Sequence, residues 1–222
     1  GAARRLPTAQ WYDSFAHIYD AAERRYHPFR LKARRQLRLK QGQTVLDVAC
    51  GTGQNFEPVL DEIGPSGRVI GIDYSPGMLD KAAERRHDSD GNAHPIHLIQ
   101  ADIRNLSYEM LRAALPHGRM RVERILCTFG LTLVTDWEET FERMWDMLAP
   151  GGRCTLMDGY IPRTNHWLQS RMVNRLSQSL TRADVTRRFW LPLQDRCEDY
   201  EEERFQYRLG TQLVIASGTK AR

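Results

Sequence analysis

The stretch at residues 45–53, VLDVACGTG, constrains the fold more than any other part of this 222-residue chain. Its first five residues are apolar except for Asp47, a pattern typical of a strand that is buried on both faces. Glycines at positions 51 and 53 then allow the backbone to turn tightly and to approach a ligand closely. A buried strand that ends in a glycine turn indicates a sheet whose strand ends carry a binding site.

Strand-like and helix-like segments alternate along most of the chain. We predict strands at 45–49, 68–73, 96–100, 122–127 and 153–158, and helices at 8–25, 29–39, 56–63, 76–86, 107–117, 137–148 and over most of 163–190. The last two strands, 201–207 and 212–217, are predicted to pair antiparallel. This order indicates an α/β fold with a mostly parallel sheet, helices on both faces and a C-terminal antiparallel hairpin.

Length and composition fit one globular domain. Hydrophobic residues make up 41% of the chain and charged residues 27%, and no run of eighteen apolar residues occurs. The N-terminal stretch lacks the apolar core of a signal peptide, so we expect a cytoplasmic protein. Its four cysteines are scattered without a Cys-x-x-Cys pair, which favours reduced packing residues over disulfides or a metal site.

The net charge of +4 is unevenly distributed. Residues 1–40 contain ten Lys and Arg against three acids, and residues 160–190 contain six Arg against one acid. Such segments can be solvated helix faces. They also fit attraction to an anionic surface, either a membrane or a nucleic acid.

Acidic residues follow the next two strands. Asp73 ends the second strand, twenty-two positions after Gly51, and Asp102 follows the third strand. An acid at the end of the second strand is placed to accept hydrogen bonds from the two hydroxyls of a ribose. The glycine turn and both acids therefore predict a nucleoside site at the carboxyl edge of the sheet.

Phosphate fits this turn poorly. A dinucleotide fingerprint needs a third glycine, but Phe56 stands at that position, and no Gly-Lys-Ser/Thr sequence occurs for a triphosphate. The carboxylate of Asp47, just before the turn, would repel phosphate. A nucleoside that carries positive charge suits these residues better.

Four motifs together resemble the class I S-adenosylmethionine-dependent methyltransferases: VLDVACGTG, VIGIDYSPGML, IQADIRNL and the LAPGGR turn. The resemblance covers roughly residues 43–158 and the last hairpin. The segments WYDSFAHIYD and LCTFGLTLVTDWEETFERMWDMLAPGGR further resemble the ubiquinone/menaquinone-biosynthesis methyltransferases and related bacterial phospholipid N-methyltransferases. The resemblance to the class I methyltransferases implies a Rossmann-like, seven-stranded sheet and S-adenosyl-L-methionine as cofactor.

The resemblance assigns the methionine end of the cofactor to the glycine turn. The backbone of Ala49, Cys50, Gly51 and Gly53 would pass close to it, and Asp47 would orient its ammonium group.

The nucleoside end is assigned to the next two strand ends. Asp73 would hold the ribose hydroxyls, with Tyr74 and Met78 packed on the adenine. Asp102 would accept a hydrogen bond from the adenine amino group, with Ile103 alongside.

The methyl-transfer side is assigned to the end of the fourth strand, CTFG, where Cys127, Thr128 and Phe129 would line the site. This sequence lacks the acidic or Asn-Pro signatures of nucleobase methyltransferases, which disfavours DNA and adenine-type RNA as substrates. The resembling families fold an N-terminal helix over the cofactor, and Tyr12 and Tyr19 share one face of the predicted helix. Together with Phe129 these aromatics could orient a cationic group, or they could face the core.

A dedicated base is needed only if the acceptor must first lose a proton, and His17 is the one candidate, against a plain packing role. The chain is thus predicted as a single domain over 1–222. It comprises N-terminal lid helices at 1–40, a cofactor-binding core at 43–158, a helical substrate-side insertion at 160–195 and a hairpin at 200–218. The insertion could cover the pocket or could lie on an anionic membrane.

Three functions remain open from the sequence. The first is methyl transfer to a small-molecule or lipid-associated acceptor, either a quinone-like carbon or the nitrogen of an amine or phospholipid headgroup. The second is an RNA or protein methyltransferase that uses the basic segments, although no separate RNA-binding module is visible. The third is a cofactor-binding protein without catalysis.

Overall fold

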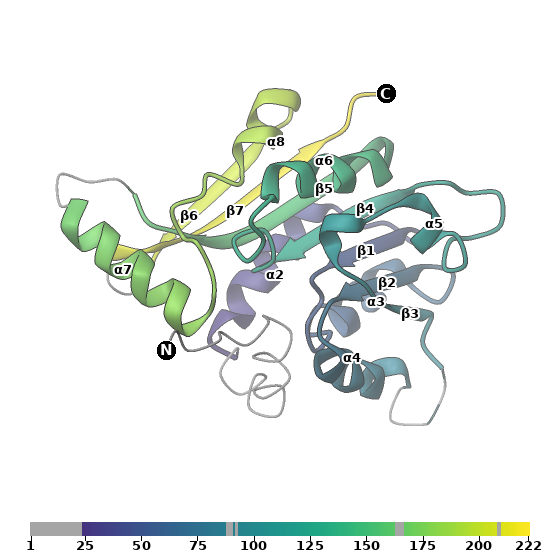
Figure 1. Ribbon diagram of the computed structural model, residues 1–222. Helices are drawn as coiled ribbons and strands as arrows, with labels where there is room; N and C mark the ends of the chain where they lie inside the picture. The colour runs from purple at the N-terminus through teal and green to yellow at the C-terminus, as the bar shows by residue number, and fades with distance from the viewer. Residues whose placement is uncertain (1–23, 88–90, 92, 163–166, 208–209) are drawn as a thin grey trace.

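The computed structural model describes residues 24–87, 91, 93–162, 167–207 and 210–222 (Figure 1). Residues 8–23 of the predicted helix at 8–25 lie outside the described residues, and with them Tyr12, His17 and Tyr19. The described part of the chain forms a seven-stranded sheet of order β3-β2-β1-β4-β5-β7-β6. Its strands are β1 (Thr44–Val48), β2 (Arg68–Asp73), β3 (Ile96–Gln100), β4 (Val122–Thr128), β5 (Leu148–Tyr160), β6 (Glu201–Gln206) and β7 (Gln212–Thr219).

Strand direction follows the prediction. The first five strands pair parallel to their neighbours, β7 pairs antiparallel to β5, and β6 pairs antiparallel to β7. The chain runs outward from β1 to β3 and then returns to the other side of β1 with β4. Such a reversal of strand order leaves a crevice at the carboxyl ends of β1 and β4, where ligands of α/β sheets bind. The predicted Rossmann-like, mostly parallel fold is confirmed.

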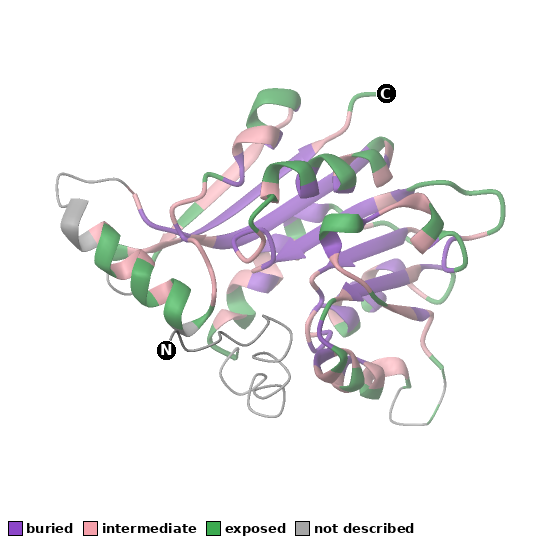
Figure 2. Cartoon of the chain, in the orientation of Figure 1, coloured by how far each residue is buried: buried purple, intermediate pink, exposed green. Residues whose placement is uncertain are grey.

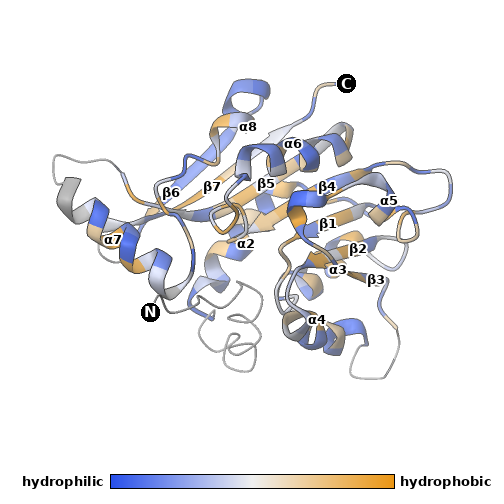
Figure 3. Cartoon of the chain, viewed as in Figure 1, coloured by the Kyte–Doolittle hydropathy of each residue, from blue (hydrophilic) through white to orange (hydrophobic). Residues whose placement is uncertain are grey.

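Helices cover both faces of the sheet. One buried cluster joins the sheet to α2 (His27–Leu37), α3 (Phe56–Ile63) and α4 (Pro76–Ala83). The other joins it to α5 (Tyr108–Leu111), α6 (Trp137–Met147) and α8 (Leu191–Arg196). Figure 2 shows the buried residues concentrated on the central strands, and Figure 3 shows that these strands are also the most hydrophobic. The near-continuous apolar strands follow from burial on two faces.

Short 3-10 turns complete the described elements: η1 (Arg24–Tyr26), η2 (Glu84–Arg86) and η3 (Ile103–Asn105). The last helix, α7 (Trp167–Leu180), extends to one side of the sheet (Figure 1). No helix among the described residues is both long and apolar enough to span a bilayer.

Two element boundaries differ from the sequence-based expectation. The helix expected at 107–117 is only one turn long. After Leu111 the chain continues as turns, with Ala114 N donating to the Leu111 carbonyl. The fifth strand begins at Leu148 instead of 153, because the backbone of Gly151 and Gly152 exchanges hydrogen bonds with Lys220 beyond β7. The predicted Pro-Gly-Gly turn is therefore absorbed into the sheet.

The arginine-rich segment also differs from the expectation. Helix α7 ends at Leu180, and residues 181–190 continue as turns and extended chain. Phe189 and Trp190, at the end of the segment that was predicted to be mostly helical, are fully buried and pack edge to face in the core. Any membrane-facing surface in this segment must therefore exclude them.

Candidate active site

A cavity of about 340 Å³ opens at the carboxyl edge of the parallel strands. It is lined by residues that follow each of the strands β1 to β4 and by one residue from α2. These residues are 49–52 and Gln54 after β1; Asp73, Tyr74, Ser75 and Met78 after β2; 102–104 after β3; 128–130 and 133–135 after β4; and Arg30 from α2.

The glycine turn owes its shape to three left-handed backbone positions. Ala49, Gly51 and Gly53 have φ values of +55°, +55° and +75°. Cys50 donates from its backbone N–H to Ile72 of β2, and Gly53 donates to the carbonyl of Cys50. The turn thereby folds back on itself, and residues 49–52 line the cavity.

Phe56 explains why the third glycine of a dinucleotide fingerprint is absent. A Cβ added to Gly53 would lie 2.6 Å from the Phe56 ring, and one added to Gly71 of β2 would meet the same ring at 2.6 Å. The ring is completely buried and fills the space between the turn and the sheet. In this chain the two glycines make room for a phenylalanine, not for a pyrophosphate.

The carboxylate of Asp73 links the glycine turn to the start of helix α4. One carboxylate oxygen accepts a hydrogen bond from Gly51 N at 2.8 Å, and the other accepts from Ser75 N at 2.9 Å. The hydroxyl of Ser75 in turn accepts from Met78 N and caps α4. The carboxylate thus lies at the cavity wall, with its position set by backbone donors from two loops.

Asp102 lies at the third strand end and caps η3. Its carboxylate accepts three side-chain hydrogen bonds from Arg104, at 2.6–3.0 Å, and one from the backbone of Arg104. These hydrogen bonds lower the pKa of Asp102, so it remains ionised at neutral pH. The sequence analysis did not single out Arg104, although it also lines the cavity.

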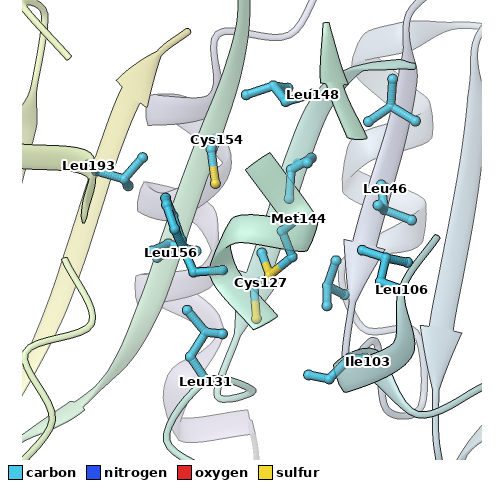
Figure 4. Close-up of a cluster of buried hydrophobic side chains, with 14 of the residues drawn as sticks. Leu46, Ile103, Leu106, Cys127, Leu131, Met144, Leu148, Cys154, Leu156 and Leu193 are labelled. Atoms are coloured by element: carbon cyan, nitrogen blue, oxygen red, sulfur yellow. The ribbon is translucent and has the colours of Figure 1, made fainter. Parts of the chain in front are cut away.

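Asp47 lies behind the glycine turn and does not line the cavity. It is 1% exposed and accepts hydrogen bonds from Asn55 Nδ2 at 3.0 and 3.3 Å. Burial raises its pKa to about 7, against the opposing effects of the Asn55 hydrogen bond and the Arg30 charge. Among the predicted cofactor residues, Gly53 and Cys127 are also absent from the cavity wall. Figure 4 shows Cys127 in the hydrophobic core near Met144 and Leu156.

Arg30 and Asn55 are site residues that sequence reasoning missed. Arg30 Nη1 donates to Thr128 Oγ1 and, at 3.4 Å, to Asn55 Oδ1, while Asn55 Nδ2 reaches Thr128 Oγ1 at 3.2 Å. Asn55 lies only two residues beyond Gly53, so its position next to the glycine turn was a signal in the sequence that its side chain could belong to the site. Arg30 lies 98 residues from Thr128, and nothing local to its helix marks it out.

Phe129 lines the cavity next to Thr128 and has a left-handed backbone, φ +60°. The Tyr26 ring lies 4.8 Å from its ring centroid, and the Arg30 guanidinium lies 5.3 Å from it. Tyr26 itself contacts Tyr207 at 5.5 Å. The structure therefore surrounds Phe129 with residues that the sequence analysis did not name.

The loop after β4 is held by the segment that follows α7. Asp184 N donates to the carbonyl of Thr132, and the Arg187 guanidinium donates to the carbonyls of Leu131 and Val134. Thr132 donates from its hydroxyl (2.7 Å) and its backbone (3.1 Å) to the buried carboxylate of Asp158. None of the described residues of 160–195 lines the cavity, but this segment fixes the loop that does.

Comparisons with known proteins agree with this architecture. A family model described as a methyltransferase domain matches residues 45–152. The demethylmenaquinone methyltransferase of Listeria welshimeri is 30% identical over 141 residues, which are 64% of this chain and 55% of that protein. The 2-phytyl-1,4-naphtoquinone methyltransferase of Thermosynechococcus vestitus is 28% identical over 160 residues, 69% of this chain and 65% of that protein. The matched part of the chain thus spans 55% and 65% of the lengths of these two relatives.

Solved structures share the fold at low sequence identity. A phosphoethanolamine N-methyltransferase 2 of Haemonchus contortus, solved with S-adenosyl-L-methionine, is 13% identical with a TM-score of 0.73, and the alignment covers 99% of this chain and 61% of that one. The methyltransferase partner of the Haloferax volcanii Trm112 activator is 17% identical with a TM-score of 0.66, over 95% and 98% of the two chains. Residues 45–152 of this chain thus match the methyltransferase-domain family model, and the chain has the Rossmann-like fold of class I S-adenosylmethionine-dependent methyltransferases.

Proposed function

We propose that this chain is an S-adenosylmethionine-dependent methyltransferase that acts on a small, quinone-like carbon acceptor. The observation that carries the proposal is the convergence of Asp73, Asp102 and the glycine turn on one cavity. A nucleoside needs hydrogen-bond acceptors for its ribose hydroxyls and its adenine amino group, and these two carboxylates supply them. The cavity volume of about 340 Å³ suits a ligand of this size.

The residues around the cavity would bind and orient both reactants. When bound, S-adenosylmethionine supplies an electrophilic methyl group on a positively charged sulfur. Asp73 would fix the ribose, and the left-handed turn at Ala49 and Gly51 would set the depth of the methionine chain. Alignment of this kind can contribute on the order of 7–11 kcal/mol to catalysis. Phe129 and Thr128 would border the acceptor side.

The quinone-like acceptor is proposed from two supports. The curated relatives named above are quinone methyltransferases, and the wall after β4 includes the apolar Leu133 and Val134 beside Phe129. An apolar wall beside an aromatic ring favours a flat hydrophobic acceptor over a small amine.

A methyl-transfer assay tests this function. The full chain would be incubated with methyl-labelled S-adenosylmethionine and, in separate reactions, a demethylated naphthoquinol, phosphoethanolamine and total RNA. We expect label in the naphthoquinol only. Label in phosphoethanolamine or RNA would replace the proposed acceptor, and an absence of cofactor binding by calorimetry would overturn the enzyme assignment as a whole.

We propose in addition that α7 brings the enzyme to an anionic membrane surface. Met172 and Leu176 are 71% and 48% exposed and lie one turn apart, and Arg171 and Arg175 beside them are exposed as well. Exposed apolar side chains flanked by arginines are typical of interfacial helices. A lipid-linked acceptor would be reached most readily from such a position.

Vesicle sedimentation tests the membrane proposal independently of catalysis. We expect binding to vesicles with an anionic lipid at low salt and weaker binding to neutral vesicles. The double variant Met172→Gln, Leu176→Gln should reduce binding, whereas Met120→Gln, an exposed methionine far along the chain, should not. Equal binding by both variants and the wild type would rule out α7 as the docking helix.

A further inference from the structure

The sheet has two edge strands, β3 and β6, which differ in how they are protected (Figure 1). β6 begins with four charged residues, Glu201 to Arg204, and its Glu203 pairs with Lys32 of α2. β3 reads Ile-His-Leu-Ile-Gln and contains no Lys, Arg, Asp, Glu or Pro. Charged residues and prolines on an edge strand oppose pairing with another chain. β3 therefore lacks the protection that β6 has.

The backbone of β3 bonds its neighbour β2 through alternate residues. The ladder between them begins with a hydrogen bond from Val69 N to the Pro95 carbonyl at 2.9 Å, and ends with one from Ala101 N to the Asp73 carbonyl at 3.0 Å. Since alternate residues of a strand bond each side, the odd-numbered residues of 95–101 face β2. The backbone N–H and C=O groups of the even-numbered residues therefore point away from the sheet.

The outward side of β3 is closed at its start. His94 N donates to the Arg86 carbonyl at 2.6 Å, and Ile96 N donates to the His94 carbonyl at 2.7 Å. Within the described part of the chain, no protein hydrogen bond reaches the outward backbone groups of Leu98 and Gln100. The open stretch is long enough for a short extended segment to pair with it.

Apolar side chains border the open stretch on both faces of the sheet. Leu98 packs against the buried cluster beneath α3 and α4, and Ile99 packs against the cluster on the opposite face. Both side chains are only half-buried, so each offers apolar surface to a chain that lies alongside. An added strand is recognised by such contacts to its alternate side chains, while its main chain supplies hydrogen bonds.

Positive charge acts on the middle of β3. Burial lowers the pKa of His97, and the charges of Arg68 and Arg86 lower it further. Arg68 begins β2, directly beside β3. Asp88 and Asp90 lie outside the described residues. Like charges opposite one another destabilise strand pairing, so this charge opposes pairing with the same edge of a second copy and favours a segment rich in Asp or Glu.

We propose that the open edge of β3 binds an extended acidic segment of another protein, which joins the sheet as an additional strand. Main-chain hydrogen bonds to Leu98 and Gln100 hold the segment, and its carboxylates lie near Arg68 and Arg86. None of residues 96–100 lines the cavity, so this docking surface is separate from the candidate active site and does not depend on the proposed methyl transfer.

Peptide titrations followed by NMR test the proposal on the full chain. The probes are a short capped peptide of alternating Glu and Val, its Lys-Val counterpart, and the Glu-Val peptide with every residue N-methylated. At low salt the Glu-Val peptide should bind at least about tenfold more tightly than the Lys-Val peptide, because the edge repels positive charge. N-methylation should weaken binding at least about tenfold, because it removes the main-chain donors. Shift changes should centre on 96–100.

Two variants test the same surface from the side of the protein. Leu98→Pro removes an N–H that faces away from β2, so the ladder keeps its bonds while peptide binding should fall at least about tenfold. Arg86→Gln should reduce the preference for the Glu-Val peptide. Arg143→Gln, which removes an exposed arginine of α6, is the matched control and should leave that preference unchanged.

Three results would overturn the proposal. The first is equal binding of the Glu-Val and Lys-Val peptides, and the second is undiminished binding of the N-methylated peptide, a result that does not depend on whether Leu98→Pro folds. The third is a wild-type dimer in sedimentation that Leu98→Pro dissociates, because the edge would then belong to a second copy of this chain.

Discussion

The two halves of the candidate site are built from contacts of very different sequence range. At the nucleoside end, Asp73 bonds Ser75 and Asp102 bonds Arg104, each two residues away. At the acceptor end, Arg30 bonds Thr128 across 98 residues, and Arg187 bonds the carbonyl of Val134 across 53. The nucleoside end therefore depends mainly on bonds within single strand ends, with one bond from Gly51 to Asp73 across 22 residues, whereas the acceptor end exists only after the helices and the insertion have packed.

This difference indicates where the site can vary. The nucleoside end consists of strand ends and their first turns, so it depends on the sheet, which is the most buried part of the chain. The acceptor end consists of distant segments, so it depends on a few individual hydrogen bonds, such as those of Thr132 and Asp184. We expect changes at the nucleoside end to affect cofactor binding strongly and changes at the acceptor end to act more through stability and loop position.

The largest effect is expected at Asp73. Asp73→Ala should weaken S-adenosylmethionine binding at least 100-fold, because the ribose would lose two hydrogen bonds to a charged acceptor, each of about 1.5–3 kcal/mol. The loss also frees the glycine turn from its bond to Gly51. Calorimetry measures the change, with Asp61→Ala, an exposed acid on α3, as control. Equal affinities of both variants would contradict the nucleoside assignment.

A pH effect of intermediate size is expected from Asp47. Its pKa is raised to about 7 by burial, so the carboxyl is protonated in the free protein below that pH. A ligand ammonium favours the ionised form, and binding must then release a proton. Affinity should therefore fall by up to about tenfold for each pH unit below 7 and level off above it.

Calorimetric titrations of S-adenosylmethionine between pH 5 and 8, run in roughly unit steps, would measure this slope. The variant Asp47→Asn should flatten it, because its side chain does not titrate. An unchanged slope in that variant would assign the pH dependence to another group.

A smaller loss of stability is expected from the glycine turn. Gly53→Ala forces a left-handed residue with φ +75° to carry a Cβ 2.6 Å from the Phe56 ring. Gly118→Ala imposes the same backbone strain at φ +78° but meets nothing within 4 Å. Denaturant unfolding should show Gly53→Ala to be less stable by about 1–3 kcal/mol than Gly118→Ala, the usual cost of overpacking. The combination Gly53→Ala, Phe56→Leu should recover part of this difference.

The smallest effect is expected on the acceptor side, at Thr132. Thr132→Val removes one hydrogen bond from the buried Asp158 and should lower the free energy of unfolding by about 1–2 kcal/mol above pH 7. Burial raises the pKa of Asp158 to about 6. Below that pH the carboxyl is neutral and gains less from hydrogen-bond donors, so the decrease in the free energy of unfolding caused by Thr132→Val should become smaller.

Thr140→Val serves as the comparison, because its hydroxyl donates to a neutral carbonyl and its effect should not change with pH. Parallel pH dependences of the two variants would contradict this account of Asp158.

Much of the fold could be read from the sequence because its signals are local. Apolar strands followed by turns, Ser75-Pro76 at a helix start and the alternation of the final hairpin each act over a few residues. The predictions were wrong where tertiary pairing overrode a local signal. Residues 150–152 look like a turn but join β5 through Lys220. Residues 181–190 were predicted to continue a helix, but they leave it and bury Trp190 in the core.

The candidate site divides in the same way. The sequence by itself determined the glycine turn and the acids at the ends of β2 and β3, because parallel strands bring their carboxyl ends to one edge whatever the rest of the chain does. Only the tertiary structure decided that Arg30 reaches this edge from α2 and that residues 184–187 hold the loop after β4. Those contacts depend on how whole helices pack, and no short stretch of residues encodes the direction in which a distant side chain will point.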